Sequence, residues 1–408
     1  MENRMRILFI HSPPDIYGAS RSLLRLCNEL RTSCALGVVL PGAGPLAIEL
    51  TQLGVEVIFH PELSIIRRPK RGGWWRLFGL PVSIIHDLRR LMEIIGAFDP
   101  DIVHTNHALM PTGAIAAMLT GRPHIWHIRE IFVEFPWLWS MYRRGVAALS
   151  SAIICNSQVT AHQFLGRDWG RLPIKVIYNG VSGVHFEAGA PEKVAAFRAR
   201  YQLSGRSVGV VGRVKLKTKG QEILVRAAAL LAKEFPDVRF VCVGDTYPGN
   251  EDHLTGLRRL ATEIGVADRL VVAGDVDDVI TAISALDVVV MPSVHPGPFG
   301  NVVMEAMAQG KPVVATSNGG GSEQVADGVT GFRVPPGDAG ALSRAIRALL
   351  SSPELRTQMG LAGARRVAEI FSARRCGNDV LALYGDVSDA WGYEHANRSG
   401  RFQWIRHP

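Results

Sequence analysis

A glycine and two basic side chains follow a short apolar run in the second half of the sequence. Residues 207–211 have the apolar pattern of a buried strand, and Gly212, Arg213 and Lys219 follow it before an expected helix. A glycine lets a ligand approach the main chain closely, and two cations can neutralise a diphosphate. The motif is neither a P-loop nor a G-x-G-x-x-G fingerprint. We interpret the three residues as candidate phosphate contacts.

A second stretch, residues 296–315, has the pattern of another phosphate site. It begins just after an apolar run and leads into a helical pattern from about Asn301 to Gln309. A helix that opens from the carboxyl end of a parallel strand offers unpaired N–H groups and a positive dipole end, which suit a phosphate. Glu305 lies one turn into the helix, within reach of whatever the phosphate carries. The alternative is an ordinary βαβ unit with a surface glutamate.

Two further candidates lie in the first half of the chain. His127 belongs to the expected strand at residues 123–130, near its carboxyl end, where ligands bind in parallel sheets. The alternative is a structural histidine. Gly18 belongs to an expected loop, residues 13–20, before a helix that starts at about Ser20; it either lets the main chain pass close to a ligand or relaxes a tight turn.

These residues need parallel sheets to position them. Apolar runs alternate with helical patterns across short connections, which predicts an α/β protein with doubly wound parallel sheets. The pattern restarts after Gly180 and ends with helices at about 339–350, 354–371 and 373–387; residues 327–338 have hairpin-like turn chemistry. We therefore predict domains at 1–180 and 181–370, a C-terminal helix at 371–390 that packs on the first domain, and a polar tail at 391–408.

The composition narrows the class of protein. With 47% hydrophobic and 20% charged residues in 408, the chain is globular and long enough for two or three domains. Its five cysteines form no paired motif, and no apolar run could span a bilayer, so we expect a cytoplasmic protein without a structural metal. A net charge of +8 predicts acidic partners, such as nucleotides or anionic lipid. The sequence contains no recognised nucleic-acid-binding module, so we do not expect nucleic acid to be a partner.

Two clusters combine basic and aromatic side chains. One, at residues 67–78, includes Arg67, Arg68, Lys70 and Arg71 beside two tryptophans; the other is residues 135–144. Such clusters suit an anionic membrane surface, which predicts a peripheral protein at the inner face of the membrane. The alternative is a solvated loop with anchoring aromatic residues. A separate acidic loop, residues 275–279, could cap a helix or contact a nucleotide.

Placed together, these features resemble the group-1, family-4 retaining glycosyltransferases of GT-B fold. The ordered motifs lie between Arg6 and Val387, over nearly the whole chain, and comprise Gly212-Arg213 with Lys219-Gly220, Pro298-Phe299-Gly300 with Glu305-Ala306-Met307, residues 310–315, Gly319-Gly320 with Glu323, and Asp327-Gly328 with Thr330-Gly331. The resemblance implies two Rossmann-like domains that face each other across a cleft and close about a hinge at Gly180.

The resemblance also implies roles for individual residues. Positions that match Arg213 and Lys219 hold the donor diphosphate, beside Gly212 and the helix start at Asn301. The position of Glu305 holds the nucleotide ribose, and the main chain at Phe299 and Gly300 approaches the sugar and phosphate. His127 matches a residue beside the reacting sugar, and Gly18 matches part of a glycine loop that faces the phosphates.

The activity implied is transfer of a sugar from a UDP- or GDP-linked donor to a hydroxyl acceptor, with retention and without a metal or other cofactor. The expected acceptor is a saccharide or lipid-linked saccharide, as in bacterial assembly of cell-surface polysaccharide. A GT-B epimerase would fit the fold but not the ordered motifs.

One departure from the family pattern concerns the donor sugar. The family has a second glutamate eight positions before the one at Glu305, where this chain has Gly297, and its N-terminal loop has Gly18-Ala19 where Gly-Gly is common. The missing carboxylate would help to hold donor-sugar hydroxyls. The alternative function is therefore a degenerate, non-catalytic GT-B protein that binds a nucleotide sugar or scaffolds a membrane assembly.

Overall fold

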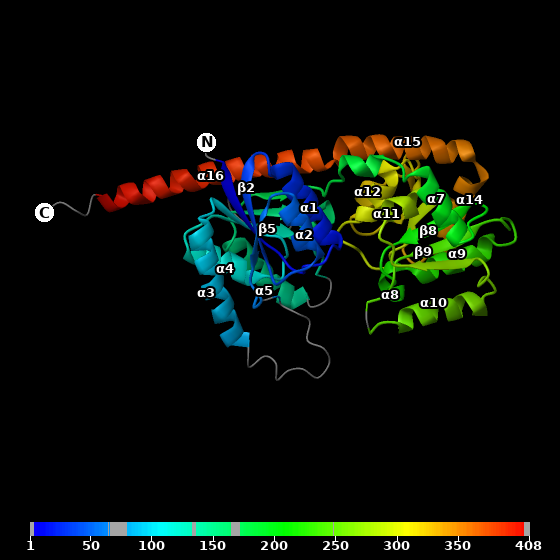
Figure 1. Ribbon diagram of the computed structural model, residues 1–408, viewed down its shortest axis with the longest axis horizontal. Coiled ribbons are helices and arrows are strands. Elements are labelled where there is room, and N and C mark those ends of the chain that lie inside the picture. The colour runs from blue at the N-terminus through cyan, green and yellow to red at the C-terminus, as the bar shows by residue number, and fades with distance from the viewer. Residues whose placement is uncertain are drawn as a thin grey trace. The chain divides into compact units, whose positions relative to one another are not determined.

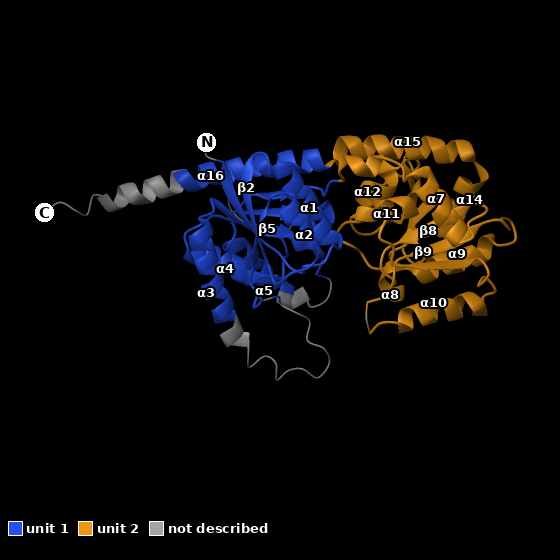
Figure 2. Cartoon of the chain, viewed as in Figure 1, with its two compact units in different colours: residues 1–180, 373–408 blue, residues 181–372 orange. Residues whose placement is uncertain are grey.

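A computed structural model describes residues 4–63, 65, 80–132, 136–164, 172–247 and 249–403. The chain divides into two compact units, which Figure 2 distinguishes by colour. Unit 1 comprises residues 1–180 and 373–408, and unit 2 comprises residues 181–372. The chain therefore leaves the first unit after Gly180 and returns to it with the final helix.

Unit 1 contains a seven-stranded sheet in which all strands run parallel, as the alternating pattern predicts. The strand order is β3-β2-β1-β4-β5-β6-β7. In this order β1 pairs with both β2 and β4, so that Ile7 lies opposite Leu36 and Ile102. The strands are β1 (Met5–Ile10), β2 (Cys34–Leu40), β3 (Glu56–Phe59), β4 (Ile102–Thr105), β5 (His124–Ile128), β6 (Ala152–Cys155) and β7 (Ile174–Val176).

Alternate side chains of the unit 1 strands pack against helices on opposite faces of the sheet. Ile7 and Phe9 belong to the hydrophobic cluster of α1 (Gly18–Leu30), α2 (Pro45–Gln52) and α16 (Ala373–Gln403). Leu8 and Ile10 belong to the cluster of α3 (Leu80–Phe98) and α4 (Pro111–Leu119). The same sheet face continues under α5 (Pro136–Ala148), and α6 (Gln158–His162) follows β6.

The C-terminal helix α16 completes the core of unit 1. Its apolar side, formed by Val380, Leu383, Tyr384 and Val387, is buried in the cluster that also contains the core side chains of α1. Figure 1 shows the helix running beside α1. The helix continues to Gln403, beyond the expected end at Val387, since no proline interrupts it there.

Unit 2 contains a second parallel sheet, of six strands in the order β10-β9-β8-β11-β12-β13. Its strands are β8 (Ser207–Val211), β9 (Arg239–Val243), β10 (Leu270–Gly274), β11 (Val288–Met291), β12 (Val313–Thr316) and β13 (Gly331–Val334). The expectation of a hairpin-like turn over residues 327–338 is wrong for β13, which is an edge strand parallel to β12. The turn residues precede this strand, and Gly331 is required because a Cβ there would clash with the Val313 carbonyl.

Helices cover both faces of the unit 2 sheet. One face packs against α9 (Gln221–Leu231), α10 (Asp252–Glu263) and α14 (Ala339–Ser351). On the other face α12 (Asn301–Ala308) contacts β11 and β12, with α11 (Val279–Ser284) and α15 (Pro353–Ile370) beside it and α7 (Pro191–Arg200) next to α11. Figure 1 shows these layers. Short helical turns complete the unit: η2 (Gly183–Phe186), α8 (Leu216–Lys219) and α13 (Gly321–Gln324).

Each sheet has one point at which the strand order reverses. The reversal lies between β1 and β4 in unit 1 and between β8 and β11 in unit 2. Loops from the carboxyl ends of the two central strands diverge at such a point, and ligands bind there in open parallel sheets. The candidate residues in unit 2 follow β8 and β11, so the topology places them at this position.

The predictions for the two clusters of basic and aromatic residues have different outcomes. Residues 66–79, which include the first cluster, lie outside the described residues. In the second, the described aromatic side chains face the core: Trp139 is buried and stacks on Phe132 at 4.1 Å between ring centroids, and Tyr142 donates a hydrogen bond to the Ala108 carbonyl. The prediction that residues 135–144 form a membrane-facing cluster is therefore wrong for these side chains, because both rings fill space between α5 and the sheet.

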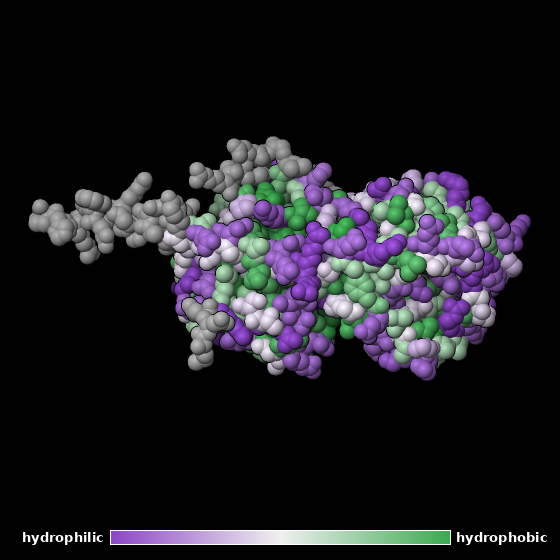
Figure 3. Space-filling model, turned by 90° about the horizontal axis from the view of Figure 1, so that it is seen from above, coloured by the Kyte–Doolittle hydropathy of each residue, from purple (hydrophilic) through white to green (hydrophobic). Residues whose placement is uncertain are grey.

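No described helix is both long enough and apolar enough to cross a bilayer. On the face visible in Figure 3, hydrophilic residues are spread over both units, with hydrophobic residues among them. Arg89 and Arg90 of α3 are exposed, and Arg90 pairs with Glu93.

Candidate functional site

The loop after β8 is held in place from beneath by a buried glutamine. Gly212 has φ +136°, a conformation that favours glycine, and its N–H donates to the Val243 carbonyl at 2.8 Å. Gln221, only 1% exposed, donates from Nε2 to the Arg213 carbonyl at 2.8 Å and accepts from the Lys215 N–H at 3.3 Å. The first residue of α9 therefore sets the path of the basic loop.

The basic loop packs directly against the segment that follows β11. Gly220 ends α8 in the left-handed conformation, and a Cβ on it would clash with the Pro292 carbonyl. The Val294 N–H donates to the Thr218 carbonyl at 3.0 Å, and His295 Nδ1 lies 2.8 Å from the Lys217 carbonyl. The basic loop thus meets, at the reversal point of the unit 2 sheet, the residues that lead directly into the second predicted stretch.

Positive charge is concentrated on this loop. The Arg213 guanidinium lies over the Tyr247 ring, 3.1 Å from its centroid, and Lys215 lies 5.4 Å from the same ring. Lys219 is exposed as a residue, yet protein atoms around its ammonium lower its pKa by desolvation, and the charge of Lys215 lowers the pKa further. Cations that repel one another in this way would be stabilised by an anion between them.

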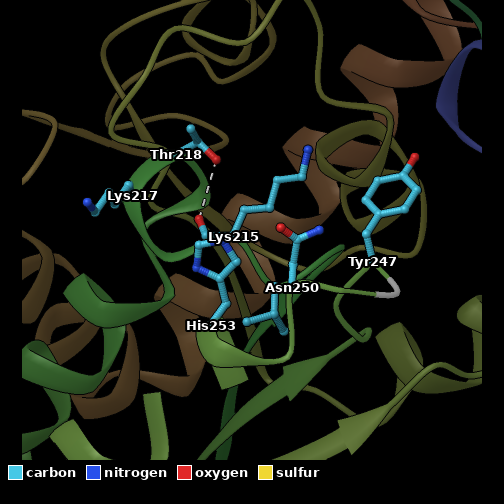
Figure 4. Close-up of a pocket in the computed structure, with 7 residues that line it drawn as sticks. Lys215, Lys217, Thr218, Tyr247, Asn250 and His253 are labelled. Carbon is cyan, nitrogen blue, oxygen red and sulfur yellow. Dashed lines mark hydrogen bonds between the residues drawn. The ribbon is translucent and has the colours of Figure 1, made fainter. Parts of the chain in front are cut away.

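A pocket of about 220 Å³ adjoins the loop. Figure 4 shows six of the residues that line it: Lys215, Lys217, Thr218, Tyr247, Asn250 and His253. None of these described side chains is acidic, and the lysines, the amide and the imidazole can all donate hydrogen bonds. The lining therefore suits an anionic or hydroxyl-rich ligand.

The start of α12 is built by close packing of the main chain. A Cβ on Gly300 would lie 2.7 Å from the Met291 sulfur, and the Gly300 carbonyl accepts a hydrogen bond from Gln324 Nε2 at 2.9 Å. The Phe299 ring packs edge-on against the buried Phe371, with centroids 6.0 Å apart. Its side chain is thus engaged within unit 2, which fits a ligand contact through the main chain of residues 299–301.

Glu305 is buried in α12 beside a histidine that the sequence did not single out. The carboxylate is 2% exposed as a residue, and its Oε1 lies 3.9 Å from His185 Nε2. His185 comes from η2, shortly after the chain enters unit 2. His185 is far from Glu305 in the sequence and belongs to no recognisable motif. The pair is therefore visible only in the folded structure.

The acidic loop at residues 275–279 serves the protein itself. Asp278 caps α11, accepting from the Thr281 N–H at 3.0 Å, and this bond lowers the pKa of its carboxyl group. Asp275 accepts from the Asp245 N–H at 3.0 Å. The capping interpretation is confirmed for Asp278.

In unit 1, His127 is the penultimate residue of β5 and is only 1% exposed. Its Nδ1 lies 3.2 Å from Arg129 Nη2, while its buried Nε2 has no hydrogen-bond partner among the described residues. Burial holds the pKa of His127 well below its usual range, and the charge of Arg129 lowers it further. The ring is therefore neutral at physiological pH.

Gly18 is the first residue of α1, two residues before the expected helix start. It is helical and not part of a preceding loop, so the expected place in a glycine loop needs correction. Ser20, in the same first turn, lies with its Oγ 3.0 Å from His11 Nε2.

The structure thus separates the predicted residues into two groups. Gly212, Arg213, Lys219 and the segment from Phe299 to Glu305 gather at the reversal point of unit 2. His127 and Gly18 lie at the carboxyl edge of the unit 1 sheet. Arg129, Asn106 and His11, which the sequence did not identify, link His127 by hydrogen bonds to Ser20 in the first turn of α1, and Asn179 bonds to Arg129. In the sequence, the signal that pointed to these residues was that the predicted strands end in polar residues.

Most of this chain matches known protein families. Residues 16–182 match the family described as Glycosyltransferase Family 4, and residues 199–366 match Glycosyl transferases group 1. The chain is 33% identical over 397 residues to the GDP-mannose-dependent alpha-(1-6)-phosphatidylinositol monomannoside mannosyltransferase of Mycolicibacterium smegmatis, covering 89% of this chain and 97% of the relative.

Two further similarities cover shorter or more distant relationships. The lipopolysaccharide core biosynthesis glycosyltransferase LpsE of Rhizobium meliloti is 32% identical over 251 residues, covering 61% of this chain and 67% of the relative. Among solved structures, Anabaena HepE in complex with UDP and glucose aligns with a TM-score of 0.79 at 25% identity, over 94% of this chain and 100% of that one.

Proposed function

The chain belongs to the glycosyltransferases of group 1 and family 4, and from this membership we propose that it transfers a sugar from a nucleoside diphosphate sugar to a hydroxyl acceptor with retention. Its two parallel-sheet units are those of the GT-B fold. The observation that carries the proposal is the contact between the basic loop and the segment that leads from β11 towards α12, at the unit 2 reversal point.

Departure of a nucleoside diphosphate places negative charge on its β-phosphate. Arg213 and Lys219 would stabilise this charge as it develops, together with the N–H groups at the start of α12 near Asn301. Preorganised donors act strongly here because they need no rearrangement during the reaction. In this proposal the side chains and the helix supply the charge that a metal ion provides in other transferases.

The remaining groups would hold the nucleoside and the sugar. Glu305 would accept hydrogen bonds from the ribose hydroxyls, and the main chain at Phe299 and Gly300 would contact the sugar and phosphate. Gly212 would let the diphosphate approach the main chain. His127 would donate from Nε2 to an oxygen of the bound sugar. The HepE structure contains UDP and glucose, which supports a nucleotide sugar as the donor class.

The transfer step conserves every atom. The bond between the anomeric carbon and the β-phosphate oxygen breaks as the acceptor oxygen bonds to the same carbon from the same face. The acceptor's hydroxyl proton passes to the departing phosphate oxygen. Retention then needs no protein nucleophile.

For the acceptor, we propose a lipid-linked saccharide, and for the location, the cytoplasmic side of a membrane. Support comes from the relatives: one acts on phosphatidylinositol monomannoside and another in lipopolysaccharide core biosynthesis. The donor base stays open between UDP and GDP, since the M. smegmatis relative is named for GDP-mannose and HepE was crystallised with UDP.

Single substitutions of the two cations test the proposal. Arg213→Ala and Lys219→Ala should each lower kcat/KM for the donor by about 100-fold, the typical loss when one transition-state donor is removed. Arg226→Ala and Lys233→Ala, exposed on and just after α9, are matched controls that should keep wild-type kinetics. If both Arg213→Ala and Lys219→Ala retain wild-type transfer at limiting donor, the phosphate assignment is wrong.

A further inference from the structure

Arg129 is a buried cation whose guanidinium forms its hydrogen bonds with neutral acceptors. It directly follows β5 and is 6% exposed. Its Nε donates to Asn106 Oδ1 at 2.9 Å, its Nη1 to Asn179 Oδ1 at 2.5 Å, and its Nη2 lies 3.2 Å from His127 Nδ1. Within the described part of the chain, no carboxylate forms an ion pair with this guanidinium. A buried arginine satisfied only by amides and a ring nitrogen is unusual, since buried charges are normally paired.

An arginine can only donate hydrogen bonds, so it dictates the direction of each bond around it. Asn106 must present its amide oxygen to Arg129, which leaves its Nδ2 to donate to His11 Nδ1 at 3.0 Å. His11 Nδ1 is therefore an acceptor, and the proton of the neutral ring must be on Nε2, 3.0 Å from Ser20 Oγ. The orientation of one amide thus sets the tautomer of a histidine beside the start of α1.

The same reasoning applies to the other branch of the network. Because Arg129 Nη2 donates to His127 Nδ1, the ring proton of neutral His127 must also be on Nε2. That N–H belongs to the atom that has no partner among the described residues. It is therefore a hydrogen-bond donor that the fold leaves for a ligand.

Both rings are neutral in the folded protein. Burial lowers the pKa of His11 to about 3, with smaller contributions from His107 and Arg129, and lowers that of His127 well below its usual range. Burial also lowers the pKa of Arg129, but only to about 10, so the guanidinium stays charged at neutral pH. The argument from donors and acceptors therefore holds across the physiological range.

We propose that Arg129 is a positioning residue that places the ring proton of both His11 and His127 on Nε2. His11 then donates to Ser20 and orders the first turn of α1. His127 donates to an oxygen of the bound sugar, a consequence that rests on the proposed glycosyl transfer. Through Asn179, Arg129 also ties this edge to the residue before Gly180, where the chain leaves unit 1.

The tautomers can be observed directly in the unaltered protein. The full chain, labelled with ¹⁵N in its histidine rings, would be studied by long-range ¹H–¹⁵N correlation NMR at pH 7.5, with signals assigned from His11→Gln and His127→Gln. We expect both rings to be neutral, with a protonated Nε2 and an unprotonated Nδ1. A proton on Nδ1 of either ring, or a positively charged ring, would overturn the proposal.

A substitution then tests whether Arg129 causes this state. In Arg129→Met, His127 should lose its uniform Nε2–H signal, and kcat should fall by about 10-fold to 100-fold, as expected for a misplaced catalytic hydrogen bond. UDP and GDP binding should be unchanged, since the contacts proposed for Arg213, Lys219 and Glu305 lie in unit 2. Arg122→Met removes an arginine from the other end of β5, where Arg122 donates to the Pro100 carbonyl, and should keep wild-type kcat and tautomers.

The outcomes separate this proposal from the proposed function. Wild-type tautomers in Arg129→Met would overturn it, whatever the value of kcat. If Arg129→Met does not fold, Arg129→Lys serves, because a lysine keeps the charge but cannot reproduce the fork of three donors. Altered histidine signals in that variant would support the proposal, and unaltered signals would contradict it. A protein with the expected tautomers that transfers no sugar would leave the tautomer assignment standing and remove the proposed function.

Discussion

The amide of Gly320 donates a hydrogen bond to the carbonyl of Gly297 at 2.8 Å, which ties the loop before α12 to the loop before α13. The two partners have different steric demands. A Cβ on Gly320 would clash with the Pro298 carbonyl, whereas a Cβ on Gly297 would meet nothing within 4 Å. Gly297 is also outside the left-handed region. The fold therefore requires glycine at 320 but not at 297, where the family has a carboxylate.

Gly297→Glu should consequently fold as well as the wild type and change how the donor sugar is held. We expect an unchanged melting temperature and a lower KM for the nucleotide sugar, with the affinity for free UDP or GDP unaltered. Steady-state kinetics and calorimetry would measure both. Gly320→Glu is the steric control and should lower the melting temperature. Loss of folding in Gly297→Glu would contradict the prediction, and absence of transfer by both it and the wild type would favour a non-catalytic binding protein.

Gln221→Leu should weaken donor binding although Gln221 need not touch the donor. The substitution removes the side-chain amide that donates a hydrogen bond to the Arg213 carbonyl and accepts one from the Lys215 N–H. Leaving these partly buried groups unsatisfied costs about 1 kcal/mol, the low end of the range for buried groups. Urea unfolding should show a loss of that order, and isothermal titration should show weaker UDP or GDP binding. Gln358→Leu, exposed on α15, is the control and should change neither quantity. Unaltered nucleotide affinity in Gln221→Leu would show that the loop does not depend on this side chain.

Stability should fall as the pH is lowered from 7 to 5.5. His124 is buried with its pKa lowered to about 3, while the unfolded chain titrates near 6.5. The unfolded state then binds a proton that the folded state does not bind. For this group, the free energy of unfolding therefore falls by about 1 kcal/mol over that interval. His11, His104 and His127 act in the same direction.

His124→Gln isolates one of these contributions, because a glutamine can still bond Thr105 Oγ1. Its free energy of unfolding should decrease by about 1 kcal/mol less than that of the wild type between pH 7 and 5.5. Equal decreases in the two proteins would mean that His124 binds a proton in the folded state.

Removing divalent metal should leave transfer intact. In the proposed mechanism Arg213, Lys219 and the start of α12 stabilise the leaving diphosphate, so no ion is needed for that charge. Initial rates in EDTA should equal those in magnesium, and adding magnesium back should have no effect. A rate that collapses in EDTA and returns with magnesium would contradict this assignment.

Neutralising Arg67, Arg68, Lys70 and Arg71 together should weaken binding to anionic liposomes. Each basic residue near such a surface contributes about 1 kcal/mol. The change lowers the net charge from +8 to +4, so the control neutralises four exposed cations of unit 2 to the same total: Arg226, Lys233, Arg258 and Arg259. Equal weakening in both variants would indicate a general charge effect and remove the argument for a lipid-binding segment.

Most strands and many of the helices could be predicted from local pattern alone. Buried parallel strands such as β8 and β11 are short continuous apolar runs, and α12 begins and ends within a residue of its predicted limits. Several elements escaped prediction, among them the helices α3, α5 and α7 and two shorter elements. The β13 strand has only four residues after a run of turn residues, and α11 has six residues, too few for a helical period to show. In both cases neighbouring strands and helices stabilise what the local sequence does not.

By itself the sequence determined the family and the parallel α/β architecture, and it predicted Arg213 and Lys219 as phosphate contacts and Glu305 as a ribose contact, because these depend on local order along the chain. Only the tertiary structure decided which side chains support them. Gln221 beneath the basic loop, His185 beside Glu305 and Arg129 between two histidines are brought together by strand order and packing, across separations that no motif spans. Hydrogen-bond direction, which sets the proton on His127, exists only where donors and acceptors meet in space.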